Sequence, residues 1–264
     1  MNVQRSEGDG TVGKALAVLE AVAAHGRPVR FGELLADSPF PKATLYRLVQ
    51  TLASQRMLRY DAERGTYAPG LRLVRMAHAA WDASSLAPVA RPHLDALSAE
   101  VGETVHLAQL DGAQVLYVDK RNAAHPVEMF SAAGKVGPAF CTGVGKAMLA
   151  ALPEAELAAA LAQQSWHAFT PATIASPDAM RAELDAIRAA GVAFDREEHE
   201  PGIVCAAVPL LSPGGRVQGA LSVTGHLGRI AMADLVAHVP ALRRAADDIE
   251  RALRDWRFPD QREE

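Results

Sequence analysis

Apolar residues near the start of the chain recur at the three- and four-residue spacing of amphipathic helices. The first such stripe consists of Val12, Ala15, Leu16, Leu19, Val22 and Ala23. It predicts a helix with Thr11 as its N-cap and Gly26 at its end. A shorter helix is expected over 30–36, followed by a turn at 37–40, because Pro39 disfavours helical backbone at the residue before it.

The next predicted helix runs from Pro41, a residue suited to the first helical position, to about Gln55. Its apolar residues form one stripe, namely Leu45, Leu48, Val49 and Leu52. The opposite face carries Ala43, Tyr46, Arg47 and Gln50, and the first turn adds Lys42 and Thr44. An aromatic hydroxyl, a guanidinium and an amide in one row suit contact with a nucleic acid groove, although an ordinary surface helix would show the same stripe.

Two short strands are expected after this helix, over 57–60 and 66–68, with Gly65 supplying the positive φ of the turn between them. Three helices followed by a hairpin predict a winged helix-turn-helix, in which the last helix enters the major groove of DNA. Arg64 lies at the tip of this wing, where it is either a phosphate contact or a solvated turn arginine.

The rest of the chain predicts a second domain of α+β class built on an antiparallel sheet. Helices are expected over 70–84, 88–101, 143–151, 153–163, 177–190 and 230–256, and strands over 104–110, 115–120, 127–130, 192–197, 203–211 and 216–224. Thr142 is the expected N-cap of the helix at 143, and residues 134–138 are expected to form a loop. The expected domains are therefore a winged helix at 1–69, a linker helix at 70–85, a sheet domain at 86–258 and a tail at 259–264.

Composition narrows the class of protein without fixing its function. With 264 residues, 49% hydrophobic and 22% charged, the chain has the composition of a globular protein. No apolar run approaches the ~20 residues of a membrane span, and the polar, acidic start is unlike a signal peptide, so a cytoplasmic protein is expected. Residues 1–82 carry a net charge of +3 and the remainder −7, which fits a DNA-binding module joined to a different domain.

Three groups of residues suggest a specific chemistry that the sequence does not favour. Gly143-Val144-Gly145-Lys146 is not a phosphate-binding loop, because Phe140 and Ala147 stand where that motif needs glycine and a hydroxyl residue. His199 with its neighbouring glutamates, Glu197, Glu198 and Glu200, is expected to be a solvated acidic turn rather than a metal site. No metal or cofactor is expected, since the two cysteines, Cys141 and Cys205, also lack metal-ligand spacing.

Cys205, His199 and Asp195 together offer a nucleophile, a base and an orienting carboxylate. This set defines the alternative function, a cysteine-dependent hydrolase with a vestigial DNA-binding domain. The favoured interpretation is that Cys205 is a small buried residue of an apolar strand that lines a pocket without reacting.

Several ordered blocks of the chain resemble the IclR family of bacterial transcription regulators. They are Ala15-Leu16-Ala17-Val18-Leu19-Glu20, Pro41-Lys42-Ala43-Thr44 with Arg47-Leu48, Tyr67-Ala68-Pro69-Gly70, Gly102-Glu103-Thr104-Val105, the block from Thr142 to Ala150, Thr170-Pro171-Ala172-Thr173-Ile174, and the block from Asp195 to Pro209. There are departures from the family pattern: Ser38-Pro39-Phe40 replaces a turn that usually contains glycine, and Ala43 stands where serine is common. Thr142 and Gly143 stand at positions that vary between members and help to shape the pocket, so the ligand cannot be copied from a relative.

The resemblance implies a GAF-like effector domain that binds a small organic molecule, often a carboxylate or an aromatic acid. It also implies a homodimer or a dimer of dimers on a partly palindromic double-stranded operator. The implied effector-binding residues are Gly143, Val144, Gly145, Asp195, Cys205, Ser222 and Thr224, with Met129 as further apolar wall. Because an ionised Asp195 would repel an acid, a hydroxylated or keto acid is expected. The apolar residues Val74 and Trp81 of the linker helix predict a dimer contact.

Overall fold

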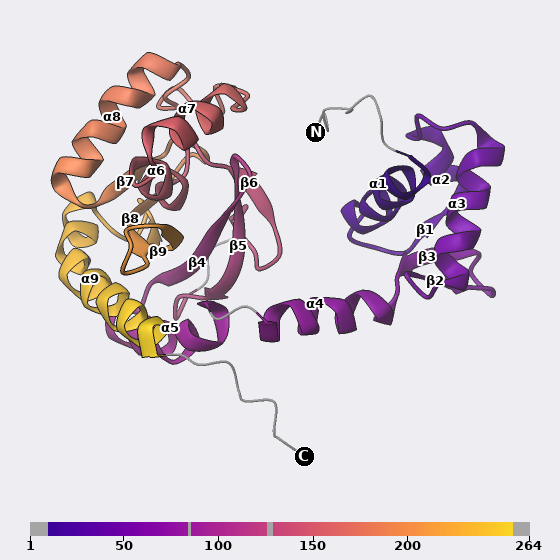
Figure 1. Ribbon diagram of the computed structural model, residues 1–264, viewed down its shortest axis with the longest axis horizontal. Helices are drawn as coiled ribbons and strands as arrows, with labels where there is room; N and C mark the ends of the chain where they lie inside the picture. Colours follow the sequence, from indigo (N-terminus) through magenta and orange to yellow (C-terminus); the bar gives the residue numbers. More distant parts are fainter. Residues whose placement is uncertain (1–9, 84–85, 126–128, 256–264) are drawn as a thin grey trace. The chain divides into compact units, whose positions relative to one another are not determined.

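The computed structural model describes residues 10–83, 86–125 and 129–255. The chain divides into two compact units, Met1–Ala83 and Ser84–Glu264, and each is described by itself below (Figure 1). Within the described ranges, no helix combines the length and the apolar character needed to cross a bilayer.

The first unit is a winged helix-turn-helix, as the sequence predicts. Its elements are α1 (Thr11–Ala24), β1 (Val29–Arg30), α2 (Phe31–Ala36), α3 (Lys42–Ser54), β2 (Leu58–Asp61), β3 (Thr66–Pro69) and α4 (Leu71–Ala83). The three strands form an antiparallel sheet in the order β1-β3-β2. The two-residue strand β1 was not predicted, because Val29 and Arg30 are too few to show an alternating pattern.

Three local predictions for this unit are wrong in detail. Gly10, not Thr11, is the N-cap of α1 and makes no side-chain cap, and Pro41 precedes α3 as its N-cap. In α1 the buried residues are Val18, Leu19 and Val22, whereas Val12 and Leu16 are 74% and 49% exposed. The predicted apolar stripe therefore includes residues that this unit does not bury.

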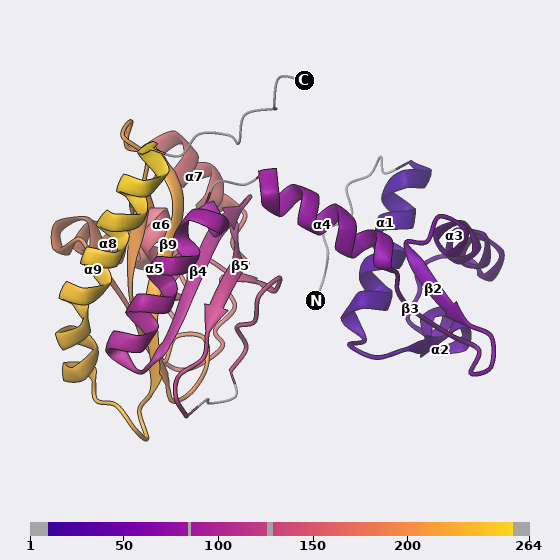
Figure 2. The ribbon, with the colours of Figure 1, turned by 90° about the horizontal axis from the view of Figure 1, so that it is seen from below.

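The second unit contains a six-stranded antiparallel sheet between two layers of helices. Its elements are α5 (Leu86–Val101), β4 (Thr104–Asp111), β5 (Gln114–Arg121), β6 (Val136–Pro138), α6 (Gly143–Ala150), α7 (Glu154–Ala162), α8 (Pro177–Ala190), β7 (Ala193–Arg196), β8 (Ile203–Leu211), β9 (Val217–His226) and α9 (Met232–Asp255). The strand order is β6-β5-β4-β9-β8-β7. Helices α5 and α9 pack together on one face, and α6 packs on the other face with α7 and α8 against it (Figure 2).

One predicted strand is misplaced. Of the range 127–130, Val127 and Glu128 lie outside the described residues, and Met129 and Phe130 are not in a strand. The edge strand is instead β6, in the stretch expected to be a loop. Gly137 permits this, because a Cβ there would lie 3.0 Å from the Phe130 ring, and a proline such as Pro138 is tolerated at a sheet edge.

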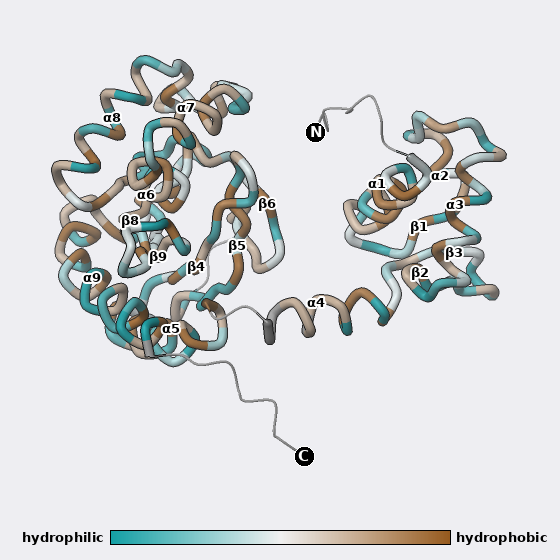
Figure 3. Tube along the Cα trace, in the orientation of Figure 1, coloured by the Kyte–Doolittle hydropathy of each residue, from teal (hydrophilic) through white to brown (hydrophobic). Residues whose placement is uncertain are grey.

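Helix α6 is the central element of this unit, because all eight of its residues are buried. The outer helices are amphipathic: α8 buries Met180, Leu184 and Ile187, while its hydrophilic residues alternate with these along the helix (Figure 3). Gly191 ends α8 with φ of 65°, as predicted. A buried α6 fixes the position of its own N-terminus relative to the sheet.

Candidate functional site

The outward face of α3 is the first candidate site. Leu45, Leu48, Val49 and Leu52 are buried, as predicted. The predicted DNA-contacting residues Lys42, Ala43, Tyr46, Arg47 and Gln50 are exposed, and Thr44 is half-buried. The helical spacing therefore separates a core face from a solvent face over the whole length of α3.

Short contacts orient this face. The backbone N–H of Phe40 donates to Ser38 Oγ at 3.1 Å, which closes the turn before α3 without a glycine. The Tyr46 ring meets the ring of Phe31 edge-on, with 5.7 Å between centroids. Gln50 Nε2 donates to the Tyr67 hydroxyl at 3.3 Å, so this amide is already tied to strand β3.

The wing between β2 and β3 is closed by Gly65, whose φ is 62°. Asp61 Oδ1 accepts the backbone N–H groups of Glu63 and Arg64 at 3.0 and 3.1 Å. This turn leaves the Arg64 side chain exposed at the wing tip.

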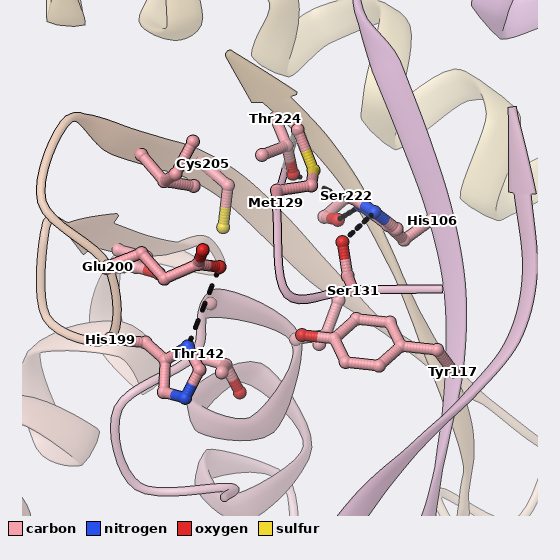
Figure 4. Close-up of a pocket in the computed structure, with 14 residues that line it drawn as sticks. His106, Tyr117, Met129, Ser131, Thr142, His199, Glu200, Cys205, Ser222 and Thr224 are labelled. Atoms are coloured by element: carbon pink, nitrogen blue, oxygen red, sulfur yellow. Dashed lines mark hydrogen bonds and ion pairs between the residues drawn. The ribbon is translucent and has the colours of Figure 1, made fainter. Parts of the chain in front are cut away.

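The second candidate site is a cavity of about 30 Å³ in the second unit, between the sheet and the start of α6. Its lining residues are His106, Tyr117, Met129, Ser131, Thr142, Gly143, Val144, Asp195, His199, Glu200, Ile203, Cys205, Ser222 and Thr224. Figure 4 shows the Tyr117 hydroxyl and the Cys205 thiol turned toward the same space. A volume of this size holds one or two water molecules.

Sheet register places the polar groups of the cavity in neighbouring strands. Asp195 of β7 lies opposite Cys205 of β8, and Cys205 lies opposite Thr224 of β9. Ser222, two residues before Thr224 and therefore on the same side, lies opposite His106 of β4.

The start of α6 closes the cavity from the other side. Thr142 is its N-cap, as predicted, and Thr142 Oγ1 accepts the Gly145 N–H at 3.3 Å. A Cβ at Gly143 would lie 2.3 Å from Cys205 Sγ, so any larger residue there would have to displace the thiol. Gly145 does not line the cavity, contrary to its predicted role: its Cα faces the backbone of Ala139, where a Cβ would lie 2.2 Å from the carbonyl oxygen.

His106 joins the cavity wall into one hydrogen-bond network. Its Nε2 shares a hydrogen bond of 2.7 Å with Ser131 Oγ, and its Nδ1 lies 3.2 Å from Thr224 Oγ1 and 3.4 Å from Ser222 Oγ. Burial lowers the pKa of His106 to about 3, so the imidazole is neutral near pH 7.

Burial also determines the protonation of the two groups next to α6. It raises the pKa of Asp195 to about 7, while the Glu198 N–H, donated to Asp195 Oδ1 at 2.8 Å, opposes that rise. It raises the pKa of Cys205 to about 12, so this thiol is protonated at neutral pH. A thiol in this state is a poor nucleophile.

The loop 197–202 is fixed by buried polar contacts. Thr170 and Thr173 donate their hydroxyls to the carbonyls of Glu197 and Glu198, each at 2.6 Å. Glu198 is only 3% exposed and pairs with the fully buried Lys146 at 2.5 Å, so the expectation of a solvated acidic turn is wrong for this residue. Across the described part of the chain, no cluster of His, Cys, Asp and Glu has a metal-binding arrangement.

Seven of the eight predicted effector-binding residues line the cavity: Met129, Gly143, Val144, Asp195, Cys205, Ser222 and Thr224. Sequence reasoning did not assign to it His106, Tyr117, Ser131, His199, Glu200 and Ile203, and it counted Thr142 among the residues that shape the pocket but not among the effector contacts. The sequence gives little sign of these residues. A histidine in a mainly apolar strand marks His106.

The architecture and the two sites define a class of protein, the transcriptional regulators that join a DNA-binding domain to a sensor domain. Residues 11–62 match the IclR helix-turn-helix domain, and residues 78–251 match the bacterial transcriptional regulator IclR C-terminal domain. The chain therefore belongs to the IclR family and is a ligand-responsive, DNA-binding transcriptional regulator of that type.

Individual relatives cover almost the whole chain. The HTH-type transcriptional regulator XynR of Escherichia coli is 32% identical over 243 residues, 92% of this chain and 96% of the relative. The transcriptional repressor IclR of Escherichia coli is 31% identical, over 82% of this chain and 80% of the relative. An IclR homolog from Microbacterium hydrocarbonoxydans, solved as a complex with 4-hydroxybenzoate, has a TM-score of 0.82 and 25% identity, over 94% of this chain and 100% of that one.

Proposed function

We propose that a small organic acid binds in the cavity and alters the affinity of the winged helix for a partly palindromic operator. The observation that carries this proposal is the cavity itself, where the N-terminus of α6 meets the hydroxyls of Ser222 and Thr224. Helix N-termini favour anions, and hydroxyls on one strand orient them. A relative crystallised with 4-hydroxybenzoate supports the same class of ligand.

The small volume of the cavity constrains how the acid is held. An acid larger than a few atoms must displace side chains, and Met129 is the most adaptable group in the wall. Asp195 already accepts the Glu198 N–H, so its remaining oxygen can accept a hydrogen bond from the hydroxyl of a hydroxylated acid or, when protonated, donate one to a keto group. Seven residues contact the effector in this proposal, namely the lining residues Met129, Gly143, Val144, Asp195, Cys205, Ser222 and Thr224.

We infer that DNA is contacted by α3 and by the wing. Lys42, Ala43, Thr44, Tyr46, Arg47 and Gln50 face the major groove, and Arg64 reaches a phosphate. Gln50 must share or release its bond to Tyr67 to reach a base. A regulator of this kind works where the chromosome is, so we place it in the cytoplasm.

We also infer a homodimer, or a dimer of dimers, formed through α1 and α4. Exposed apolar side chains support it: Val12 and Leu16 on α1, and Leu71, Val74 and Met76 on α4, are each about half exposed or more. The Trp81 side chain lies outside the described part of the chain. The domain boundaries 1–69, 70–85, 86–258 and 259–264 belong to this proposal. Light scattering at micromolar concentration should give at least a dimer, and a monomer with and without DNA would contradict it.

The protein is proposed not to be an enzyme. A hydrolase would need a Cys205 thiolate, and burial keeps that thiol protonated. Cys205→Ser should therefore retain operator binding, and the parent should show no turnover of esters or thioesters. Turnover that disappears in Cys205→Ser would support the hydrolase instead.

The whole proposal is tested by selecting genomic DNA fragments on the purified protein and sequencing them. Organic acids are then screened for release of the selected DNA at fixed salt, because the phosphate contribution depends on salt. We expect enrichment of sites with two related half-sites and release by at least one small acid. Fragments without a shared motif, or no response to any acid, would contradict the proposal.

A further inference from the structure

The cavity contains carboxylates but no fixed cation. Among its described lining residues, Asp195 and Glu200 are acidic, and none is lysine or arginine. The imidazole of His106 is buried, and its two nitrogens are already bonded to hydroxyls. Lys120 on β5 lies close enough to act on His106 and Glu200, but it is outside the lining and its Nζ donates to the Ser131 carbonyl at 2.9 Å. Among the described lining groups, an acid that enters as an anion meets carboxylates and the positive end of α6.

Lys146, a buried cation on α6, is already neutralised. Lys146 Nζ lies 2.5 Å from Glu198 Oε1 and 2.8 Å from Glu183 Oε1, and its side chain is fully buried. Arg196 also contacts Glu183, at 3.7 Å. Lys146 has no charge left over for a ligand, because two carboxylates share it.

Asp195 is the group in the wall best placed to compensate a ligand charge. Its side chain is buried, and one oxygen accepts the Glu198 N–H at 2.8 Å. Within the described residues, no hydrogen bond to its second oxygen, Oδ2, is present. The start of α6 lies close by, because a Cβ on Gly143 would lie 3.6 Å from the Asp195 nitrogen.

We propose that the effector carboxylate binds together with one proton, which Asp195 carries, so that the Asp195 carboxyl donates a hydrogen bond to the effector. The ligand is then an acid whose anion enters together with one proton, so that the pair adds no net charge to the cavity. The proton comes from solvent whenever Asp195 is ionised before binding, and no covalent bond to the effector forms or breaks. This inference rests on the proposed function of the cavity as an acid-binding site.

The surroundings of Asp195 support a shared proton. Cys205 on β8, Cys141 before α6 and Tyr117 on β5 interact with it, and burial raises the pKa of each. Glu198 and His199 of the loop also act on it, and Glu200 lines the same cavity. Lys146 and His199 favour ionised Asp195, whereas burial and Glu198 disfavour it. The resulting pKa of about 7 makes the two states of Asp195 comparable at neutral pH.

Linkage gives the size of the effect. If only protonated Asp195 binds the acid, affinity falls about tenfold between pH 6 and pH 8. The number of protons taken up per acid rises from about 0.1 at pH 6 to about 0.9 at pH 8. A merely structural Asp195 would produce neither change.

The test is calorimetric titration of the full chain at pH 6 and pH 8, in two buffers of different ionisation enthalpy, which gives proton uptake directly. The probes are 4-hydroxybenzoate, benzoate and pyruvate, with 4-hydroxybenzamide as a neutral analogue. Asp195→Asn keeps the size of the side chain and donates a hydrogen bond at every pH. Asp111→Asn, at the exposed last residue of β4, is the matched control.

We expect an acid to bind the parent and Asp111→Asn about tenfold more weakly at pH 8 than at pH 6, with proton uptake. Asp195→Asn should lose that dependence and bind about tenfold more tightly than the parent at pH 8. His199→Gln should retain the uptake at pH 8, which separates Asp195 from the neighbouring imidazole. Any binding of the neutral amide should be independent of pH.

Two results would overturn the inference. Acid binding without proton uptake at pH 8 would overturn it alone and leave the acid-binding cavity standing. Failure of every acid to bind at either pH would overturn the proposed function and this inference together. If Asp195→Asn does not fold, proton uptake by the parent and by His199→Gln decides the question.

Discussion

The two units present their candidate functional groups in opposite ways, one on an exposed face and the other in a buried cavity. In the first unit a single helix, α3, presents a continuous row of exposed side chains over one buried stripe. In the second unit, strands β4, β5, β7, β8 and β9, two loops and the start of α6 each contribute to one buried cavity.

The difference also concerns charge. The cations of α3, Lys42 and Arg47, are solvated and free to meet a phosphate or a base. The cation of α6, Lys146, is fully buried between two carboxylates. An exposed cation is expected to contribute to DNA binding and little to the stability of the fold. A buried cation is expected to contribute to stability and little to binding.

The largest expected effect tests the buried side of this comparison. Lys146→Met leaves Glu198 buried without its partner, so the free energy of unfolding of the second unit should fall by ~3–5 kcal/mol. Urea denaturation of the full chain measures it. Lys14→Met, at an exposed position of α1, is the control and should change stability by less than ~0.5 kcal/mol. A loss equal to that of the control would show that the pair is not needed for stability.

Arg47→Ala tests the role of the exposed cations on α3. Operator binding should weaken by ~1–3 kcal/mol because a contact to a base or phosphate is lost, while the unfolding free energy stays within ~0.5 kcal/mol of the parent. Fluorescence anisotropy at matched salt measures the affinity. Arg251→Ala, an exposed change on α9, should leave specific binding unaltered. Equal affinity of Arg47→Ala and the parent would place the DNA on another face.

Burial of His106 makes the free energy of unfolding depend on pH. Its folded pKa of about 3 lies below the ordinary value of 6.5, so the unfolded chain takes up the proton first and stability is lost as pH falls below 6.5. Between pH 7 and pH 5 this loss is ~2 kcal/mol. Asp195 changes stability in the opposite direction over that range: its pKa is raised in the fold, so the folded state binds the proton and stability rises as pH falls.

Comparison with His106→Gln isolates the histidine, since Asp195 is present in both proteins. The stability difference between parent and variant, from urea denaturation, should shift by ~2 kcal/mol against the parent from pH 7 to pH 5. A difference that is the same at both pH values would mean that folding leaves the pKa of the imidazole unchanged.

The smallest expected effect concerns the cavity wall. Ser222→Ala adds no bulk to the cavity wall and removes a hydroxyl that lies 3.4 Å from His106 Nδ1. Effector affinity should fall by ~1–2 kcal/mol, with DNA affinity unchanged in the absence of effector. Calorimetry with the acid found in the release screen measures it. An unchanged response to that acid would move the binding site elsewhere.

The sequence predicts the surface of α3 well, because every residue of that face lies on one helix with one period. It predicts the cavity less completely. Asp195, Cys205, Ser222 and Thr224 were identified through the family resemblance, and pairing between strands brings them together.

The residues that were missed come from places where no local pattern operates. His106 and Tyr117 enter the cavity from strands on the far side of β9, and Ser131 and Glu200 enter from loops. The edge strand is β6 and not the predicted strand at 127–130, and this too could not be predicted from a local pattern. The close approach of Gly137 to Phe130 is a tertiary contact. Periodicity cannot report a contact between distant segments.

The small volume of the cavity has a consequence for the kinetics of sensing. A space of about 30 Å³ admits one or two water molecules, so the described conformation has no room for an aromatic acid. Opening must precede or accompany entry, and the apparent dissociation constant includes the cost of opening. If opening comes first, the observed association rate will reach a plateau at high effector concentration, and the plateau is the opening rate itself.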